Sequence, residues 1–191
     1  MTDGEAARWA PDETVLLIAV PEAEPLMGGT RERYGPEAED GIPAHVTVLY
    51  PFLPAGRIDA GVLADLRDLF AGHEPFGLTF TGFGRFPEVL WPAPEPDGPV
   101  RALTAAVTAR WPEAPPYGGA YDDPVPHLTV AHKQPEATYA AVEREFAPGL
   151  PLRAGVTEVR LMVREGVRWH HRASFPLRGG GGRNGVGPAR P

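Results

Sequence analysis

Gly41-Ile-Pro-Ala-His-Val-Thr-Val-Leu-Tyr-Pro-Phe52 is the segment from which the fold of this chain is most readily predicted. Its centre is rich in Val and Thr, residue types that favour a β-strand over a helix. Side chains alternate between the two faces of a strand, so His45, Thr47 and Leu49 are predicted to share one face. The residues between them can pack against a core on the other face. The segment therefore predicts a rigid strand that presents an imidazole and a hydroxyl side by side.

The same pattern returns in the second half of the chain. We call residues 45–48 (HVTV) motif 1 and residues 127–130 (HLTV) motif 2. By the same parity, His127 and Thr129 share one face of a second predicted strand. In a chain with 6 histidines, composition alone would produce roughly 0.06 matches to His-apolar-Thr-apolar. The pair therefore argues against the alternative of two ordinary strands whose polar faces meet solvent.

The length of 191 residues is typical of one domain, or of two small lobes that share a core. We expect a single bilobal domain over residues 13–178. Residues 1–12 are polar and are expected to form a flexible N-terminus. Residues 179–191 are rich in Gly and are expected to form a disordered tail.

Charge and cysteine content exclude several classes of function. The net charge is −7, whereas a protein that holds long nucleic acid by its phosphates is usually basic. This favours a small anionic ligand or the end of an RNA chain, and no extended nucleic-acid surface. The absence of cysteine excludes a disulfide framework and a thiolate site. No apolar run is long enough to cross a membrane, and no basic signal-peptide segment is evident, so we expect a cytoplasmic protein.

Apolar periodicity and turn residues predict the other elements of the fold. Strands are expected at residues 13–20, 75–83, 88–91, 152–163 and 167–177, and helices after Asp59, from Pro99 and from Pro135. Residues 21–43 and 112–126 are rich in Pro and Gly and are expected to be long loops.

The order motif strand, helix, alternating strand occurs twice. The first helix ends in Phe70-Ala71 and is followed by a strand from Pro75, while the later helix ends in Phe146-Ala147 and is followed by one from Pro151. The apolar spacing after each of these prolines is the same. This repeat predicts two similar α+β lobes related by a pseudo-twofold axis, with the two motifs facing each other across one cleft.

The paired H-x-T-x motifs resemble those of the two-histidine phosphoesterase superfamily, most closely the 2′-5′ RNA ligase family, also described as RNA 2′,3′-cyclic phosphodiesterases. The likeness covers roughly residues 13–177 in layout. It implies an α+β bilobal fold of two antiparallel sheets with helices outside and a central cleft. It also implies that His45 and His127 are catalytic and that Thr47 and Thr129 contact the phosphate. Members of the superfamily act on different RNA ends and cyclic nucleotides, so the resemblance leaves the substrate open.

The residue types suit this chemistry independently of the resemblance. Two imidazoles on opposite sides of a cyclic phosphate can act as base and acid. Threonine hydroxyls can donate hydrogen bonds to non-bridging oxygens as charge develops there. No carboxylate cluster accompanies the motifs, so neither a metal nor another cofactor is required. We therefore expect a monomeric, metal-independent phosphoesterase acting on RNA 3′ ends or small cyclic nucleotides, with 2′-5′ ligation as the reverse reaction. Which histidine is the base stays open.

Other side chains are weaker candidates. Lys133 shares the strand parity of motif 2 and could reach a phosphate, or could simply be an exposed strand end. His132 faces the other way and is expected to be structural. His170 and His171 are adjacent on a strand and lack the partners of a metal site. Six more side chains could hold a phosphate or stack on a base, or could be ordinary surface, hinge or core residues: Arg31, Arg33, Tyr34, Phe52, Trp91 and Tyr121.

Two other functions remain open at this stage. A non-enzymatic module could bind nucleotides or RNA ends in the same cleft without turnover, although a pure binder would not need both imidazoles. A metal-dependent hydrolase built on the scattered histidines has no ligand spacing in its favour.

Overall fold

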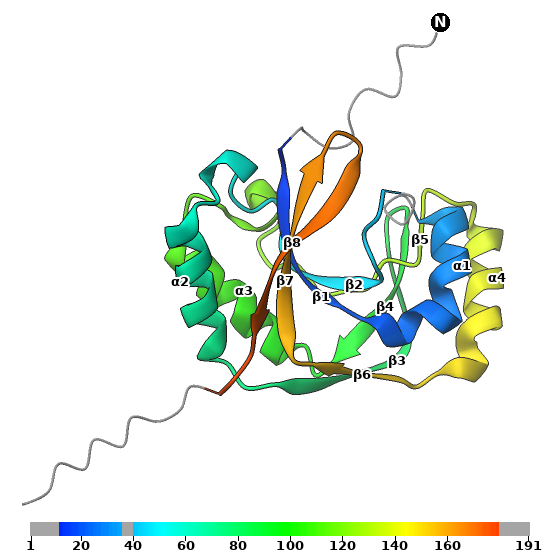
Figure 1. Ribbon diagram of the computed structural model, residues 1–191. Coiled ribbons are helices and arrows are strands. Elements are labelled where there is room, and N and C mark those ends of the chain that lie inside the picture. Colours follow the sequence, from blue (N-terminus) through cyan, green and yellow to red (C-terminus); the bar gives the residue numbers. More distant parts are fainter. Residues whose placement is uncertain (1–11, 36–39, 180–191) are drawn as a thin grey trace, which may run out of the picture.

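The computed structural model of this chain describes residues 12–35 and 40–179 (Figure 1). The predicted flexible N-terminus and Gly-rich tail therefore lie outside the described residues, except for Asp12 and Gly179. The strands are β1 (Thr14–Ala19), β2 (His45–Leu49), β3 (Phe76–Phe86), β4 (Val89–Glu95), β5 (Ala131–His132), β6 (Leu152–Val156), β7 (Glu158–Glu165) and β8 (Arg168–Pro176). The α-helices are α1 (Glu24–Tyr34), α2 (Ala60–Ala71), α3 (Gly98–Arg110) and α4 (Glu136–Phe146).

The strands form two antiparallel sheets of four strands each, which confirms the predicted α+β architecture. One sheet has the order β2-β1-β7-β8 and the other the order β5-β4-β3-β6. Motif 1 is the edge strand β2 of the first sheet, and motif 2 leads directly into the edge strand β5 of the second. The two motifs thus occupy equivalent edges, as a pseudo-twofold arrangement requires.

The helices lie outside the sheets and lock the two halves together. In Figure 1, α2 and α3 lie on one side of the molecule, and α1 and α4 on the other. Helix α1 connects β1 to β2 of the first sheet but contacts β5 of the second. Helix α3 connects β4 to β5 of the second sheet but contacts β2 of the first. Each crossover helix therefore supports the motif strand of the opposite lobe.

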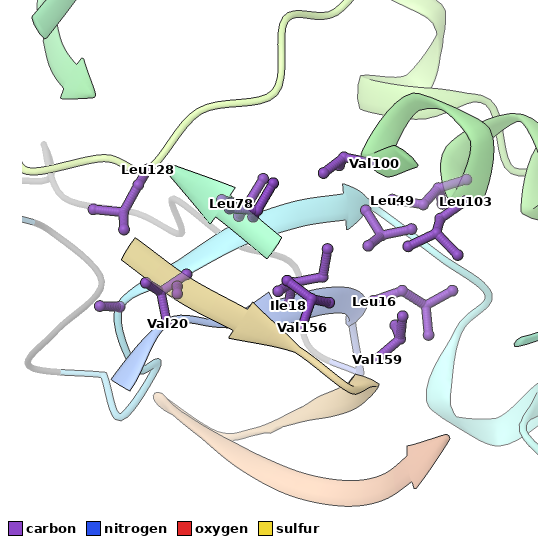
Figure 2. Close-up of a cluster of buried hydrophobic side chains, with 14 of the residues drawn as sticks. Leu16, Ile18, Val20, Leu49, Leu78, Val100, Leu103, Leu128, Val156 and Val159 are labelled. Carbon is purple, nitrogen blue, oxygen red and sulfur yellow. The ribbon is translucent and has the colours of Figure 1, made fainter. Parts of the chain in front are cut away.

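A single large core joins the sheets and helices. It includes Leu16 and Ile18 of β1, Leu49 at the end of β2, and Leu103 of α3 (Figure 2). Alternate residues of β1 point the other way and form a smaller cluster with Trp169 of β8. Strand β1 is thus buried on both faces, which explains why its sequence is almost continuously apolar. His45 and Thr47 of the neighbouring strand lie on the side of the smaller cluster.

The predicted side of Leu49 is wrong. The pairing of β1 with β2 shifts register between Leu16 and Leu17, and such a bulge rotates the residues beside it. As a result Leu49 is buried in the main core, whereas Tyr50 packs against the smaller cluster. The bulge therefore brings an aromatic phenol to the face that carries His45.

Three other expectations need correction. Residues 21–43 are not one long loop, because they contain α1, which is stabilised by fully buried Met27 rather than by its own helix propensity.

Motif 2 is not a regular strand. Leu128 donates its N–H to the carbonyl of Pro92, but Pro92 has no N–H with which to return the bond. The strand expected at residues 152–163 divides at Thr157 into β6 and β7, which belong to different sheets.

The helix predictions are confirmed. Asp59 caps α2 by accepting the Val62 N–H at 2.9 Å. Pro99 lies in the first turn of α3, and Pro135 is the N-cap residue of α4.

Candidate active site

Both motifs line one small cavity between the two sheets, which we call the central cavity. Its volume is about 80 Å³, which exceeds the roughly 10–15 Å³ that a single water molecule requires and leaves room for a small polar group. The lining residues are Val15, Ile42, His45, Thr47, Tyr50, Tyr117, His127, Thr129 and Trp169. The structure thus brings together all four side chains that strand parity predicts to face each other.

The edge strand β2 holds His45 and Thr47 rigidly. His45 pairs across the sheet with Ala19, and Thr47 pairs with Leu17. On the strand's outer edge, the hydroxyl of Thr104 in α3 donates a hydrogen bond of 2.7 Å to the carbonyl of Val48. An edge strand would otherwise leave such carbonyls unpaired. The motif is therefore fixed from both sides.

The two imidazoles are oriented by the same kind of local hydrogen bond. Nδ1 of His45 lies 2.8 Å from the carbonyl oxygen of Pro43, and Nδ1 of His127 lies 2.8 Å from that of Val125. A carbonyl only accepts, so a neutral ring must carry its proton on Nδ1 to make this bond. Nε2 is then the nitrogen that exchanges protons with a ligand in each case.

The environments of the two rings differ. His45 is only 9% exposed, and this burial is the main reason that its pKa is lowered from 6.5 to about 4. The positive charge of Arg31 lowers the pKa further, while the bond to Pro43 and the charge of Glu24 act in the opposite direction. His127 is partly exposed.

His127 rests against two aromatic rings. The centroid of its imidazole lies 5.0 Å from that of Phe86, edge to face, and 5.9 Å from that of Trp91. Trp91 packs directly over its cross-strand neighbour Gly84, where any Cβ would clash with the indole. The aromatic pair supports the motif 2 histidine in the absence of a regular strand.

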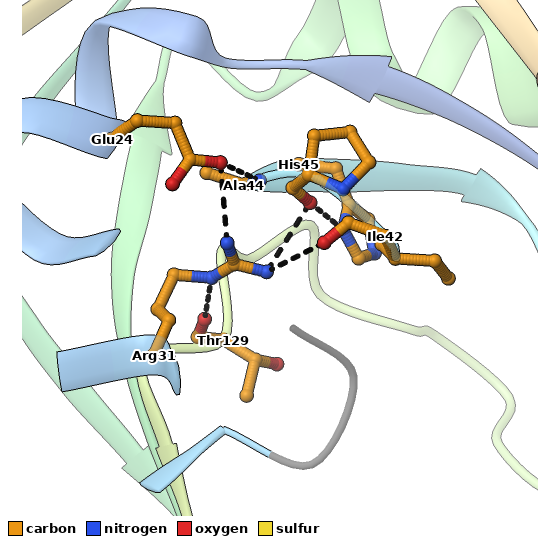
Figure 3. A network of polar contacts seen from close by, with 7 residues as sticks. Glu24, Arg31, Ile42, Ala44, His45 and Thr129 are labelled. Carbon is orange, nitrogen blue, oxygen red and sulfur yellow. Dashed lines mark hydrogen bonds and ion pairs between the residues drawn. The ribbon is translucent and has the colours of Figure 1, made fainter. Parts of the chain in front are cut away.

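Arg31 of α1 connects the two motifs (Figure 3). Its guanidinium donates hydrogen bonds to the carbonyls of Pro43, at 3.2 Å, and Thr129, at 3.3 Å. Pro43 is the residue whose carbonyl also orients His45. Glu24, at the start of the same helix, pairs with Arg31 at 3.4 Å and accepts the Ala44 N–H at 2.6 Å. One ion pair thus fixes the backbone of both motifs.

The weaker candidates have mostly structural positions. Arg31 is 4% exposed and is committed to backbone carbonyls. Phe52 packs edge to face on Trp111 in the core. Tyr121 is 64% exposed and lines the two larger cavities. Lys133 has a positive φ of 51° and is not among the residues that line the central cavity.

Tyr117 is a cavity residue that the sequence prediction missed. It has a φ of 51°, in the left-handed region that costs energy for a residue with a side chain. Its N–H donates a bond of 2.5 Å to the carbonyl of Tyr50, which ties the loop to the end of β2. The two glycines that follow Tyr117 in a Pro-rich loop are the sequence signal for such a turn.

Two larger cavities adjoin the central cavity. The α3 cavity, of about 540 Å³, lies between α3 and residues 116–126 and reaches Thr47. The aromatic cavity, of about 400 Å³, is lined by Phe86, Tyr121 and His127 among others. Tyr117 lines both of them as well as the central cavity.

Within residues 12–35 and 40–179, no group of three or more His, Asp or Glu side chains is placed to hold a metal ion. None of the helices in that part of the chain is long and apolar enough to cross a membrane.

Comparison with known protein families identifies the superfamily of this chain. The model of the 2′-5′ RNA ligase superfamily matches residues 19–168. The chain belongs to the 2′-5′ RNA ligase superfamily. The predicted resemblance to two-histidine phosphoesterases is thereby confirmed.

Solved structures agree with this assignment to the 2′-5′ RNA ligase superfamily. E. coli LigT in complex with 3′-AMP is 20% identical, with a TM-score of 0.58 over 88% of this chain and 99% of LigT. The protein TT0787 of Thermus thermophilus is 20% identical, with a TM-score of 0.57 over 88% of this chain and 100% of TT0787. At this identity the likeness concerns the fold. No curated protein matches the chain.

Proposed function

We propose that this member of the 2′-5′ RNA ligase superfamily is a metal-independent phosphoesterase that opens 2′,3′-cyclic phosphates. The observation that carries the proposal is that two imidazoles, each held by a carbonyl two residues before it, line one small cavity together with Thr47 and Thr129. Histidine pairs of this kind supply general base and general acid to a reaction that needs both.

His45 is the general base in this proposal. Because burial lowers its pKa to about 4, the free ring is neutral near pH 7 and can accept a proton. The negative charge of a bound phosphate raises the pKa of a nearby histidine, which strengthens it as a base. His45 takes a proton from water as the water oxygen bonds to phosphorus.

His127 is the general acid. As the bond from phosphorus to one ribose oxygen breaks, His127 gives that oxygen a proton, so the product is a 2′- or 3′-phosphomonoester. The hydroxyls of Thr47 and Thr129 donate hydrogen bonds to the non-bridging oxygens, on which negative charge grows in the transition state. With a 5′-hydroxyl in place of the attacking water, the same machinery forms a 2′-5′ linkage.

The surroundings of the central cavity suit a nucleotide ligand. The aromatic cavity beside His127 offers ring faces on which a base can stack. E. coli LigT, a structural neighbour, has been solved in complex with 3′-AMP. The leaving ribose oxygen, which His127 protonates, would place the nucleoside on this side of the phosphate.

The experiment is to incubate the protein, with and without EDTA, with 2′,3′-cyclic nucleotides and with short RNAs that end in a cyclic phosphate. We expect phosphomonoester products in both conditions. His45→Ala and His127→Ala should each lose at least about 10²-fold in kcat/KM, while His170→Ala, which alters an exposed histidine of β8, should stay fully active. Nucleotide binding without any turnover would instead support the binding-module alternative.

A further inference from the structure

A 2′,3′-cyclic phosphate offers two ribose oxygens that can leave, because its phosphorus is bonded to both O2′ and O3′. Water forms one new bond to phosphorus, and one of these two bonds breaks. The freed oxygen takes the proton of His127, while the other oxygen keeps the phosphate as a monoester. The leaving oxygen must lie opposite the attacking water and beside His127. The orientation of the nucleoside therefore decides whether the product is a 2′- or a 3′-phosphate.

Tyr117 lies where this orientation can be controlled. Of the residues that the structure describes, it alone lines the central cavity, the α3 cavity and the aromatic cavity. The α3 cavity, of about 540 Å³, and the aromatic cavity, of about 400 Å³, both fall within the range of roughly 300–1,000 Å³ found for small-molecule sites. A nucleoside attached to a phosphate in the central cavity thus has two spaces to enter, and Tyr117 borders both.

The backbone of Tyr117 is strained. Its φ of 51° and ψ of 33° lie in the left-handed region, which an aromatic residue rarely adopts. The next two residues, Gly118 and Gly119, also have positive φ but carry no side chain. Strain of this kind collects at binding and catalytic sites. The chain thus keeps an aromatic ring at a position where glycine or asparagine would be relaxed.

The ring of Tyr117 is held from two directions. Its N–H donates to the carbonyl of Tyr50 at 2.5 Å, and Tyr121 packs edge to face on the ring with centroids 5.6 Å apart. Tyr121 itself lines only the two larger cavities. Phe86 and His127 share the wall of the aromatic cavity with Tyr117. A nucleoside that fills this cavity would contact the Tyr117 ring and keep its ribose beside His127.

We propose that Tyr117 is a specificity residue whose ring directs the nucleoside into the aromatic cavity and so selects which phosphorus–oxygen bond breaks. The ring offers the nucleoside a stacking surface, and its bulk narrows the way from the phosphate to the α3 cavity. Without the ring, the nucleoside would adopt more than one orientation and either ribose oxygen could face His127. The assignment of the central cavity to the phosphate rests on the proposed function.

The test measures the ratio of 2′- to 3′-phosphate formed from adenosine 2′,3′-cyclic monophosphate, by phosphorus NMR. The unaltered protein should form one isomer in at least about tenfold excess. Tyr117→Asn tolerates the left-handed backbone and lacks the ring, so it should form both isomers in amounts within about threefold of each other. Tyr117→Gly is a second variant without the ring and should behave in the same way.

Two controls keep the product ratio of the unaltered protein. Tyr117→Phe retains the ring and loses only the hydroxyl. Tyr121→Asn removes a neighbouring ring that does not line the central cavity. Circular dichroism shows that each variant is folded, so that a lost preference can be assigned to the missing ring.

A binding measurement needs no turnover. Calorimetry compares adenosine 2′-monophosphate with adenosine 3′-monophosphate, whose freed hydroxyls occupy different positions on the ribose. The unaltered protein should bind one of them at least about threefold more tightly, and Tyr117→Asn should bind the two alike.

Equal formation and equal binding of the two isomers by the unaltered protein would overturn the role of Tyr117, and so would a Tyr117→Asn variant that keeps the full preference. Failure of both monophosphates to bind would overturn it as well. Absence of any turnover by the unaltered protein would instead refute the proposed function, while the binding comparison still decides the role of Tyr117.

Discussion

Replacement of Arg31 by methionine should lower the free energy of unfolding and raise the pKa of His45. The side chain of Arg31 is 5% exposed, and its guanidinium reaches the carbonyls of Thr129, Pro43 and Ile42 at 3.2–3.5 Å. Methionine keeps the buried stem and removes every donor. With about 1 kcal/mol for each net hydrogen bond and little for the ion pair to half-exposed Glu24, the free energy of unfolding should fall by about 2–4 kcal/mol.

The pKa of His45 gives a second, independent measurement. The charge of Arg31 lowers this pKa and that of Glu24 raises it. Arg31→Met should therefore raise the pKa of His45, whereas Glu24→Gln, which keeps an acceptor for the Ala44 N–H, should lower it. A general loosening of the fold would not move the two variants in opposite directions.

Urea unfolding followed by circular dichroism measures the stability change, and an NMR titration of the imidazole measures the pKa. Arg33→Met is the matched control, because it removes the same charge from an exposed position of the same helix. The reasoning is refuted if Arg31→Met changes neither quantity by more than Arg33→Met does.

Three further outcomes are expected. Thr47→Val or Thr129→Val should leave the fold intact and reduce kcat by about 10²-fold in a steady-state assay; unchanged kinetics in both variants would show that the threonine hydroxyls have no catalytic role. The pKa of His45 is about 4 in the folded protein and near 6.5 in the unfolded chain. The unfolded state therefore binds more protons between these two pH values. The free energy of unfolding should fall by about 3 kcal/mol as the pH drops from 6.5 to 4. His45→Gln should flatten that part of the curve of unfolding free energy against pH. The profile of kcat/KM against pH should be bell-shaped, with an acid limb near the low pKa of His45 that is unchanged by EDTA; an acid limb above pH 7 would assign the base elsewhere.

Strand alternation predicted much of the candidate site. The parity of motif 1 alone places His45 and Thr47 on one face, and the repeat of the motif places their counterparts opposite. The rule failed at Leu49 because register depends on the neighbouring strand, and the bulge in the pairing with β1 has no signal within motif 1 itself.

The parts that could not be predicted depend on tertiary contacts. Helix α1 contains Gly28 and Gly29, which disfavour a helix locally, and it forms because Met27 and Arg31 are buried against distant segments. The sequence alone makes Arg31 a possible phosphate ligand, because the partners of an arginine are fixed only when the chain has folded. The position of Tyr117 likewise follows from a bond to Tyr50, which is far from it in the sequence.

The carbonyls that orient the two histidines have a consequence for how such a site can arise and persist. Each imidazole is held by the main chain two residues before it, so five consecutive residues contain the reacting group, its orienting acceptor and the hydroxyl donor. The acceptor that orients each ring is therefore inherited with the ring in one short segment, while a distant group such as Arg31 holds that segment in place. Copying one short segment would supply a second imidazole together with its own orienting acceptor.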